Sequence, residues 1–247
     1  MAGAIGAVGN NGRGVTGVCW QVSLMCLKAI PEDISGRSGY DTEPPLTRAL
    51  AYALKMGAQI VNCSWGKFHY TKGYYDLMKE GAGCGVSYVA AAGNGGTNVD
   101  RHPMYPACFK LPNVLSIMAS QKEDDPLALG REVVTNFGPR TILVASPGAR
   151  ILTTAPLLLG DRAGFGRAYP KTFSCSIATA VATGIAALVK SANPALGAEE
   201  IIRISNMLKQ LLNYSRPGNK KDEFVYFSLE PIISDTIELF KYYFKRQ

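Results

Sequence analysis

Histidine is scarce in this sequence of 247 residues, which contains only His69 and His102. None of its six cysteines forms a Cys-x-x-Cys pair, so the ligand spacing typical of a structural zinc site is missing. Charged residues make up 18% of the chain, yet no uninterrupted apolar run reaches the ~18 residues of a membrane span. These absences argue against a zinc module and predict no membrane span.

The net charge of +7 raises the question of a nucleic-acid partner, because clustered basic residues neutralise phosphates. Here the basic residues are scattered along the chain. The densest groups are Arg216 with Lys220 and Lys221, and the tail at 241–246. They resemble solvated chain ends, and we therefore expect no nucleic-acid partner.

The length fits one domain with a core large enough to need no disulfides. Strand-like apolar runs alternate with helix-like stretches, which predicts an α/β fold with a mostly parallel sheet and helices on both faces. The character changes after residues 214–221. We therefore predict a domain over residues 1–213 and an extension of unknown role over residues 214–247.

The expected elements follow from periodicity and from Gly and Pro breaks. The predicted strands are 21–29, 59–63, 86–91, 114–119 and 142–145. The predicted helices are 45–56, 74–81, 176–192 and 197–212. Because the helix at 176–192 is apolar on nearly all sides, it should run through the core.

A serine stands where a loop meets this core helix. Ser176 lies in the run Thr172 to Gly184, which is rich in small residues. A helix N-terminus stabilises developing negative charge, because its free amides and its dipole point there. The alternative is an ordinary N-cap serine, since serine is a preferred capping residue. The rest of the chain decides between these interpretations.

A second candidate site follows the strand at 86–91. The run Ala90 to Gly96 ends this strand with small residues and places Asn94 in a turn. An ordinary turn is one interpretation. The functional one is that the Asn94 side chain and the Ser176 amide together donate to an oxyanion. Ala91, Ala92 and Gly93 would then leave room for a substrate side chain.

Other segments agree with a peptide-binding site. Ser64, Trp65 and Gly66 end the strand at 59–63 and could offer a backbone edge to an extended peptide. Two tight turns lie at 136–138 and 146–148, and a glycine-rich loop at 7–18 leads into the first predicted strand.

This ordered set of segments resembles the catalytic domain of subtilisin-like serine proteases (the subtilase family, peptidase S8). Ser174 to Gly184 follows the family's Gly-Thr-Ser-Met-Ala-Ser-Pro-His-Val-Ala-Gly block in register, which makes Ser176 the nucleophile. The family's Ala-Ala-Gly-Asn block matches Ala91 to Asn94, and its Ser-Leu-Gly strand matches Ser64 to Gly66. Its Ser-Asn-Phe-Gly and Ala-Pro-Gly blocks match Thr135 to Gly138 and Ser146 to Gly148.

The resemblance covers roughly residues 1–205 and implies a subtilisin-like three-layer fold. It also implies serine endopeptidase activity on peptide or protein substrates, with no required cofactor and with passage through the secretory pathway. A structural calcium is a further implication, with Asn11 and the carbonyls of Gly9, Arg13 and Val15 as ligands. The alternative is a bare Gly/Asn turn. The spacing in this loop does not match the nucleotide-binding Gly-x-Gly-x-x-Gly pattern.

The sequence departs from the family at its start. The family's histidine block survives as Met1-Ala2-Gly3, the catalytic histidine would lie four positions before Met1, and the aspartate block would lie further upstream. We therefore expect a fold that is incomplete at the N-terminus and a chain that is inactive on its own. His69 and His102 are expected in surface loops. The alternative function is a pseudoprotease that binds extended peptides without cleaving them.

The nucleophile block differs from the family pattern at four positions. Ser174, Cys175, Ala180 and Val181 replace glycine, threonine, proline and histidine, respectively. Because glycine permits close backbone approach, we expect Ser174 to crowd the site.

Overall fold

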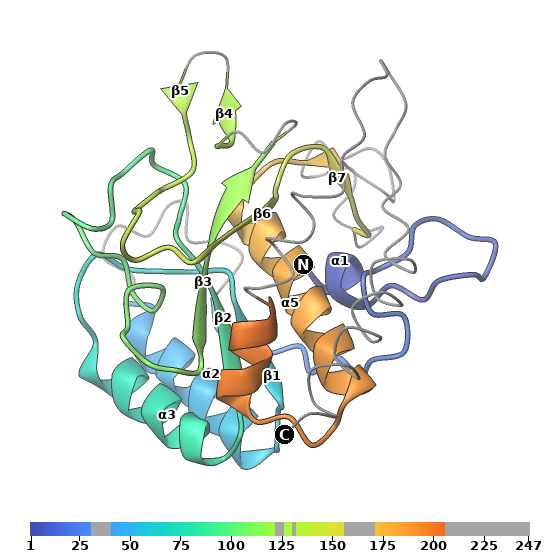
Figure 1. Ribbon diagram of the computed structural model, residues 1–247, viewed down its shortest axis with the longest axis horizontal. Coiled ribbons are helices and arrows are strands. Elements are labelled where there is room, and N and C mark those ends of the chain that lie inside the picture. Colours follow the sequence, from blue (N-terminus) through green and yellow to red (C-terminus); the bar gives the residue numbers. More distant parts are fainter. Residues whose placement is uncertain (31–40, 122–125, 130–131, 156–170, 206–247) are drawn as a thin grey trace, which may run out of the picture.

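The computed structural model describes residues 1–30, 41–121, 126–129, 132–155 and 171–205. Within them lies a four-stranded parallel sheet in the order β1-β2-β3-β6 (Figure 1). The strands are β1 (Ile60–Cys63), β2 (Ser87–Ala91), β3 (Val114–Ser120) and β6 (Val144–Pro147). Four of the five predicted strands are therefore confirmed, with ends that differ by one or two residues.

The predicted helices are also found. They are α2 (Glu43–Lys55), α3 (Lys72–Gly83) and α5 (Cys175–Ala192), preceded by a short α1 (Ala2–Gly6). The last predicted helix is seen over residues 198–205; its remainder and the proposed boundary at 213/214 lie outside the described residues. Two small antiparallel pairs join β4 (Ala128–Leu129) to β5 (Glu132–Val133) and β7 (Ile151–Leu152) to β8 (Lys171–Thr172).

Side chains that alternate along the strands divide the core into two layers. Val89 and Ala91 of β2 pack in one cluster with α5 and with residues 201–204. Tyr88 and Ala90 of the same strand pack in another cluster with α2 and α3. This two-residue period is what a sheet covered on both faces requires. The predicted three-layer α/β fold is confirmed, with α5 on one face of the sheet and α2 and α3 on the other (Figure 1).

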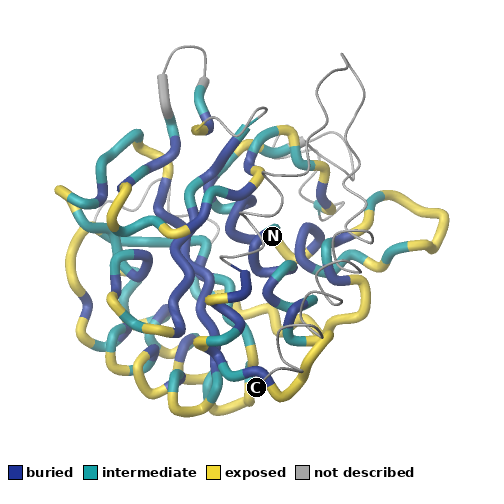
Figure 2. The backbone as a smooth tube through the Cα atoms, viewed as in Figure 1, coloured by how far each residue is buried: buried dark blue, intermediate teal, exposed yellow. Residues whose placement is uncertain are grey.

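Helix α5 runs through the core, as its apolar sequence predicted. It contacts β1, β2, β3 and β6, and it is mostly buried along its length (Figure 2). By length and composition it could also cross a membrane, but 56% of that apolar window is buried inside the structure. Packing in the core accounts for its apolar character.

The predicted strand at 21–29 is wrong. This segment forms no strand with any described residue, and large apolar side chains along it are exposed. They are Val22, Leu24, Met25 and Leu27, and Trp20 directly before the segment is exposed as well. Its composition favours extended backbone, but a strand also needs a neighbour for its hydrogen bonds, and the described sheet ends at β1.

Candidate active site

Ser176 lies at the start of α5, with its side chain partly exposed. The helix begins there because Ser174 caps it: the Ser174 hydroxyl accepts a hydrogen bond from the Ile177 amide at 3.1 Å. The Ser174 amide in turn donates to the Gly148 carbonyl at 2.9 Å. The Ser174 hydroxyl serves as the cap and its backbone is extended, with φ −175°; crowding of a substrate by Ser174 stays a prediction.

The amides of the first turn of α5 are not all used. The Ile177 amide donates to Ser174, and the Cys175 amide donates to Asn94 Oδ1 at 2.7 Å. The Ser176 amide has no hydrogen-bond partner in the described part of the chain. A free first-turn amide beside a serine hydroxyl is a donor available to a bound anion.

Asn94 is fixed by this contact. Because its Oδ1 accepts from the Cys175 amide, the other end of the side chain must be the amide group Nδ2, which can only donate. Asn94 itself is exposed in the turn after β2. The structure thus brings the two residues that the sequence suggested as a pair to the same end of α5.

Two reciprocal hydrogen bonds join the end of β1 to the start of α5. The Ser176 hydroxyl donates to the Ser64 carbonyl at 3.2 Å, and the Ser64 hydroxyl donates to the Ser176 carbonyl at 2.8 Å. Residues 112 positions apart in the sequence therefore lie in contact. The Ser176 hydroxyl is thus bonded to a carbonyl oxygen, and among the residues with a described placement it contacts no base.

Sequence reasoning missed the polar side chains that support Ser64. Asn62 Nδ2 donates to the Ser64 hydroxyl at 3.0 Å, and the Thr183 hydroxyl donates to Asn62 Oδ1 at 3.0 Å. This row runs from the interior of α5 to the end of β1. The sequence does contain a signal for these contacts, since Asn62 lies in an apolar strand and Thr183 in an apolar helix. Buried polar groups need hydrogen-bond partners, so two such residues could have been expected to pair.

Trp65 and Gly66 follow β1 and are half-buried. The Trp65 ring packs edge-on against Tyr74, with ring centroids 5.0 Å apart. It also packs against the hydrophobic core cluster to which α2 and α3 contribute. The main-chain groups of Trp65 and Gly66 make no backbone hydrogen bond within the described ranges. An extended peptide could therefore pair with them.

Asn136 shapes the turn that carries Asn94. Its Oδ1 accepts from the amides of Gly95 at 2.9 Å and Thr97 at 3.0 Å. Its Nδ2 donates to the Ala92 carbonyl at 2.7 Å. Asn136 is 1% exposed, so it is a structural cross-link inside the site. The sequence had indicated only a tight turn at this position.

A side chain of this chain lies directly at Gly93, whereas room for a substrate side chain beside Ala91, Ala92 and Gly93 stays a prediction. All three residues are buried. A side chain added at Gly93 would meet Met104 Sδ at 2.5 Å. Gly93 therefore makes space for a side chain of this chain, which the sequence could not reveal.

Neither histidine is bonded to Ser176. The His69 ring lies 3.6 Å from a Glu43 carboxylate oxygen and is 64% exposed, and His102 is also exposed. Cys175 cannot replace the serine as nucleophile, because burial raises the pKa of its thiol and only a thiolate attacks well. Ser176 is thus the candidate nucleophile of the described site, without a base.

The predicted calcium loop offers one side-chain ligand. Asn11 Oδ1 accepts a hydrogen bond from the Arg13 amide at 3.0 Å, as in an ordinary Asx turn. In the described ranges no cluster of three or more His, Cys, Asp or Glu could hold a metal ion. Calcium at this loop stays a prediction, and no step below depends on it.

The comparisons with known proteins decide the family. The subtilase family model, peptidase S8, matches residues 1–224. The chain belongs to the subtilase family. Membership supports serine endopeptidase chemistry by resemblance, because the matched residues include both Ser176 and Asn94.

Several curated subtilases resemble the chain. Alkaline elastase YaB of Bacillus sp. (strain YaB) is 30% identical over 210 residues, which cover 85% of this chain and 48% of the relative. M-protease of Shouchella clausii (strain KSM-K16) is 28% identical over 209 residues, or 85% of this chain and 47% of the relative. Subtilisin-like protease 2 of Plasmodium falciparum (isolate 3D7) is 28% identical over 197 residues, or 77% of this chain and 13% of the relative. The chain thus spans less than half the length of each.

Proposed function

We propose that this chain carries the nucleophile and oxyanion-binding part of a subtilisin-like serine endopeptidase. One observation carries the proposal: within the described residues, the Ser176 amide and the Asn94 side-chain amide are donors without a hydrogen-bond partner at the start of α5. A tetrahedral intermediate of acyl transfer needs such a pair. Peptides or proteins are the substrates.

The reaction follows from this arrangement. A substrate peptide pairs with the backbone at Ser64–Gly66, and its scissile carbonyl lies over the start of α5. The Ser176 oxygen attacks the carbonyl carbon, and its proton passes to a base and then to the leaving amine. The oxyanion accepts hydrogen bonds from the Ser176 amide and Asn94 Nδ2. Water then cleaves the acyl ester and regenerates the serine.

The base and the acid that orients it come, in this proposal, from polypeptide that precedes residue 1. The position of α1 supports this origin, because Ile5 packs in one cluster with Ile177 and Ala180 of α5. The chain therefore enters α1 beside the first turns of the helix that carries Ser176 (Figure 1). A histidine one helical turn earlier could reach the serine hydroxyl.

The exposed apolar segment at 20–27 supports the same origin. It carries five large exposed apolar side chains, and β1 is the last strand of the described sheet. A further strand between the two would hydrogen-bond to both and cover apolar surface. That strand is where the family places its aspartate block.

The second candidate is a pseudoprotease that binds extended peptides. It is favoured by the hydrogen bond of the Ser176 hydroxyl to the Ser64 carbonyl, which leaves the serine inactive. It predicts peptide binding that Ser176→Ala does not change, and no cleavage in any form of the protein.

Reading the sequence in frame upstream of the Met1 codon begins the test. An Asp-x-Gly block followed by a His-Gly-x-His block is expected. The protein that carries them should cleave a chromogenic peptide, and its Ser176→Ala variant should not. A stop codon directly upstream, or a folded longer form without activity, would refute the endopeptidase proposal and favour the pseudoprotease.

A further inference from the structure

The hydrogen bonds between the interior of α5 and Ser176 can be arranged in two ways. Thr183 is 5% exposed, and its hydroxyl lies 3.0 Å from Asn62 Oδ1 and 2.8 Å from the Thr179 carbonyl oxygen. The Ser64 hydroxyl lies 2.8 Å from the Ser176 carbonyl oxygen and 3.4 Å from Asn62 Oδ1. A hydroxyl has a single proton, so each of the two donates to one of its acceptors at a time.

In the first arrangement the Thr183 hydroxyl donates to Asn62 Oδ1. Asn62 Nδ2 then donates to the Ser64 oxygen at 3.0 Å, and the Ser64 proton is left for the Ser176 carbonyl. All three side chains of this row, Thr183, Asn62 and Ser64, have partners. The residue that carries the candidate nucleophile is thereby tied to the end of β1.

The second arrangement follows when the amide group of Asn62 turns over, which exchanges Oδ1 and Nδ2 with little change in shape. Nδ2 then donates to the Thr183 oxygen, and the Thr183 proton goes to the Thr179 carbonyl. The Ser64 proton goes to Asn62. The side chains again have partners, but the Ser176 carbonyl loses its bond from Ser64. The two arrangements therefore differ at the candidate nucleophile.

We propose that Thr183 and Asn62 are positioning residues, which hold Ser176 in place through Ser64. The distances favour the first arrangement, because the Ser64 hydroxyl lies nearer to the Ser176 carbonyl than to Asn62. The tie fixes the residue that supplies both the attacking hydroxyl and one oxyanion donor. A displacement of about 1 Å at reacting groups can cost about 10²-fold in rate. This inference rests on the proposed function of Ser176.

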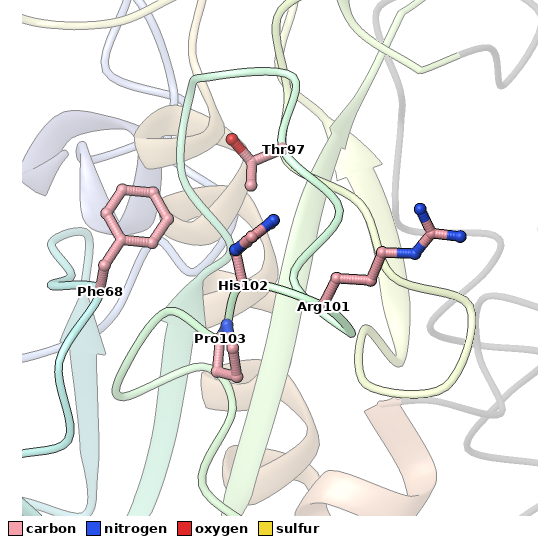
Figure 3. Close-up of a pocket in the computed structure, with 5 residues that line it drawn as sticks. All are labelled: Phe68, Thr97, Arg101, His102 and Pro103. Atoms are coloured by element: carbon pink, nitrogen blue, oxygen red, sulfur yellow. The ribbon is translucent and has the colours of Figure 1, made fainter.

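The row does not line the cavity shown in Figure 3. That cavity has a volume of about 390 Å³ and is lined by Phe68, Thr97, Arg101, His102 and Pro103. Substitutions at Thr183 leave it unchanged. We therefore expect them to alter the rate of the chemical step and not the binding of a peptide.

The test uses the longer form that carries the upstream histidine and aspartate blocks, with a peptide p-nitroanilide that this form cleaves. Thr183→Val nearly keeps the shape of the side chain but removes its hydroxyl, whereas Thr183→Ser keeps the hydroxyl. Asn62→Asp keeps the shape but cannot donate, so its carboxylate draws the Ser64 proton away from Ser176. Thr47→Val is the matched control, because the Thr47 hydroxyl donates to the carbonyl four positions earlier, at 2.8 Å, on α2.

Thr183→Val should lower kcat about tenfold with KM nearly unchanged, because the loss is one of positioning. Asn62→Asp should lower kcat at least as much. Thr183→Ser and Thr47→Val should keep the wild-type kcat. Each kcat is measured well below the Tm of that variant, so that unfolding does not contribute. A wild-type kcat in Thr183→Val, or an equal loss in Thr47→Val, would overturn the inference.

A double-mutant cycle separates this role from a contribution of Thr183 to stability alone. Ser64→Ala interrupts the row, so Thr183→Val should lower kcat no further in that background. A full additional loss, or a wild-type kcat in Ser64→Ala, would show that Thr183 does not act through Ser64 and would overturn this inference alone. A folded longer form that cleaves no peptide and takes up no fluorophosphonate would overturn the proposed function, and the inference with it.

Discussion

The packing around the candidate nucleophile predicts a clear loss of stability for the substitution Gly148→Ala. A side-chain carbon at Gly148 would lie 2.6 Å from Ala119 Cβ, 2.8 Å from the Ser174 carbonyl oxygen and 3.2 Å from Ala178 Cβ. None of these atoms is the far end of a flexible side chain. Relief of the clash therefore requires movement of β3, of α5 or of the loop that begins α5.

The expected cost is that of overpacking, about 1–3 kcal/mol of unfolding free energy. For a chain of this size that corresponds to a fall in Tm of about 2–12 °C. Thermal unfolding followed by far-ultraviolet circular dichroism measures it. Because the clash includes the Ser174 carbonyl, the variant should also react more slowly at Ser176 below its Tm.

Gly83→Ala is the matched control. Gly83 is the last residue of α3, and a side-chain carbon there would meet nothing within 4 Å. Alanine is favoured over glycine in a helix by up to about 1 kcal/mol, so this variant should keep or raise the Tm. A Gly148→Ala protein as stable as the wild type, or an equal loss in both variants, would refute the packing argument.

Three further outcomes are expected. Asn94→Ala should lower the Tm modestly, because the Cys175 amide loses its acceptor and loss of such a contact at a helix start costs about 0.5–2 kcal/mol. In the active form it should reduce kcat about 10²–10³-fold, the effect known for loss of such a donor in subtilisin, a member of the same family; unchanged kcat would remove Asn94 from the oxyanion site. Ellman's reagent should modify the exposed Cys26 and Cys84 in the native protein and the buried Cys63 only after unfolding; rapid native modification of Cys63 would contradict the described core. Burial raises the pKa of the Cys63 thiol from 9.0 to about 12, so the unfolded chain ionises first and stability should fall as pH rises from 9 towards 12. Cys63→Ala should lose less stability over that interval, as urea unfolding at stepped pH would measure, and an equal loss would show that this thiol is not the cause.

Much of the fold could be predicted because it depends on local pattern. The strands β2 and β3 are buried on both faces and read as continuous apolar runs, while α5 is apolar all round. The same local logic failed at residues 21–29, because pairing is a property of two segments and cannot be seen in one. Extended propensity alone therefore predicted a strand that the described sheet does not contain.

In the candidate site, too, some features could be predicted from local sequence and others could not. Ser176 and Asn94 could be suggested from small-residue blocks, since a helix start and a turn each have a sequence signature. The contents of the space beside Gly93 could not, because Met104 reaches it from a loop eleven positions further along the chain. Small residues indicate that something approaches closely, but they do not distinguish a substrate from a side chain of the same protein.

Covalent labelling with a fluorophosphonate tests the central claim most directly, because this reagent bonds to an activated serine oxygen. The adduct is located by peptide mass spectrometry in the 247-residue chain and in the form that carries the upstream histidine and aspartate blocks. The account predicts a single adduct at Ser176 in the longer form, its loss in Ser176→Ala, and little labelling of the shorter chain. A folded longer form that stays unlabelled, or an adduct on any other residue, would contradict it.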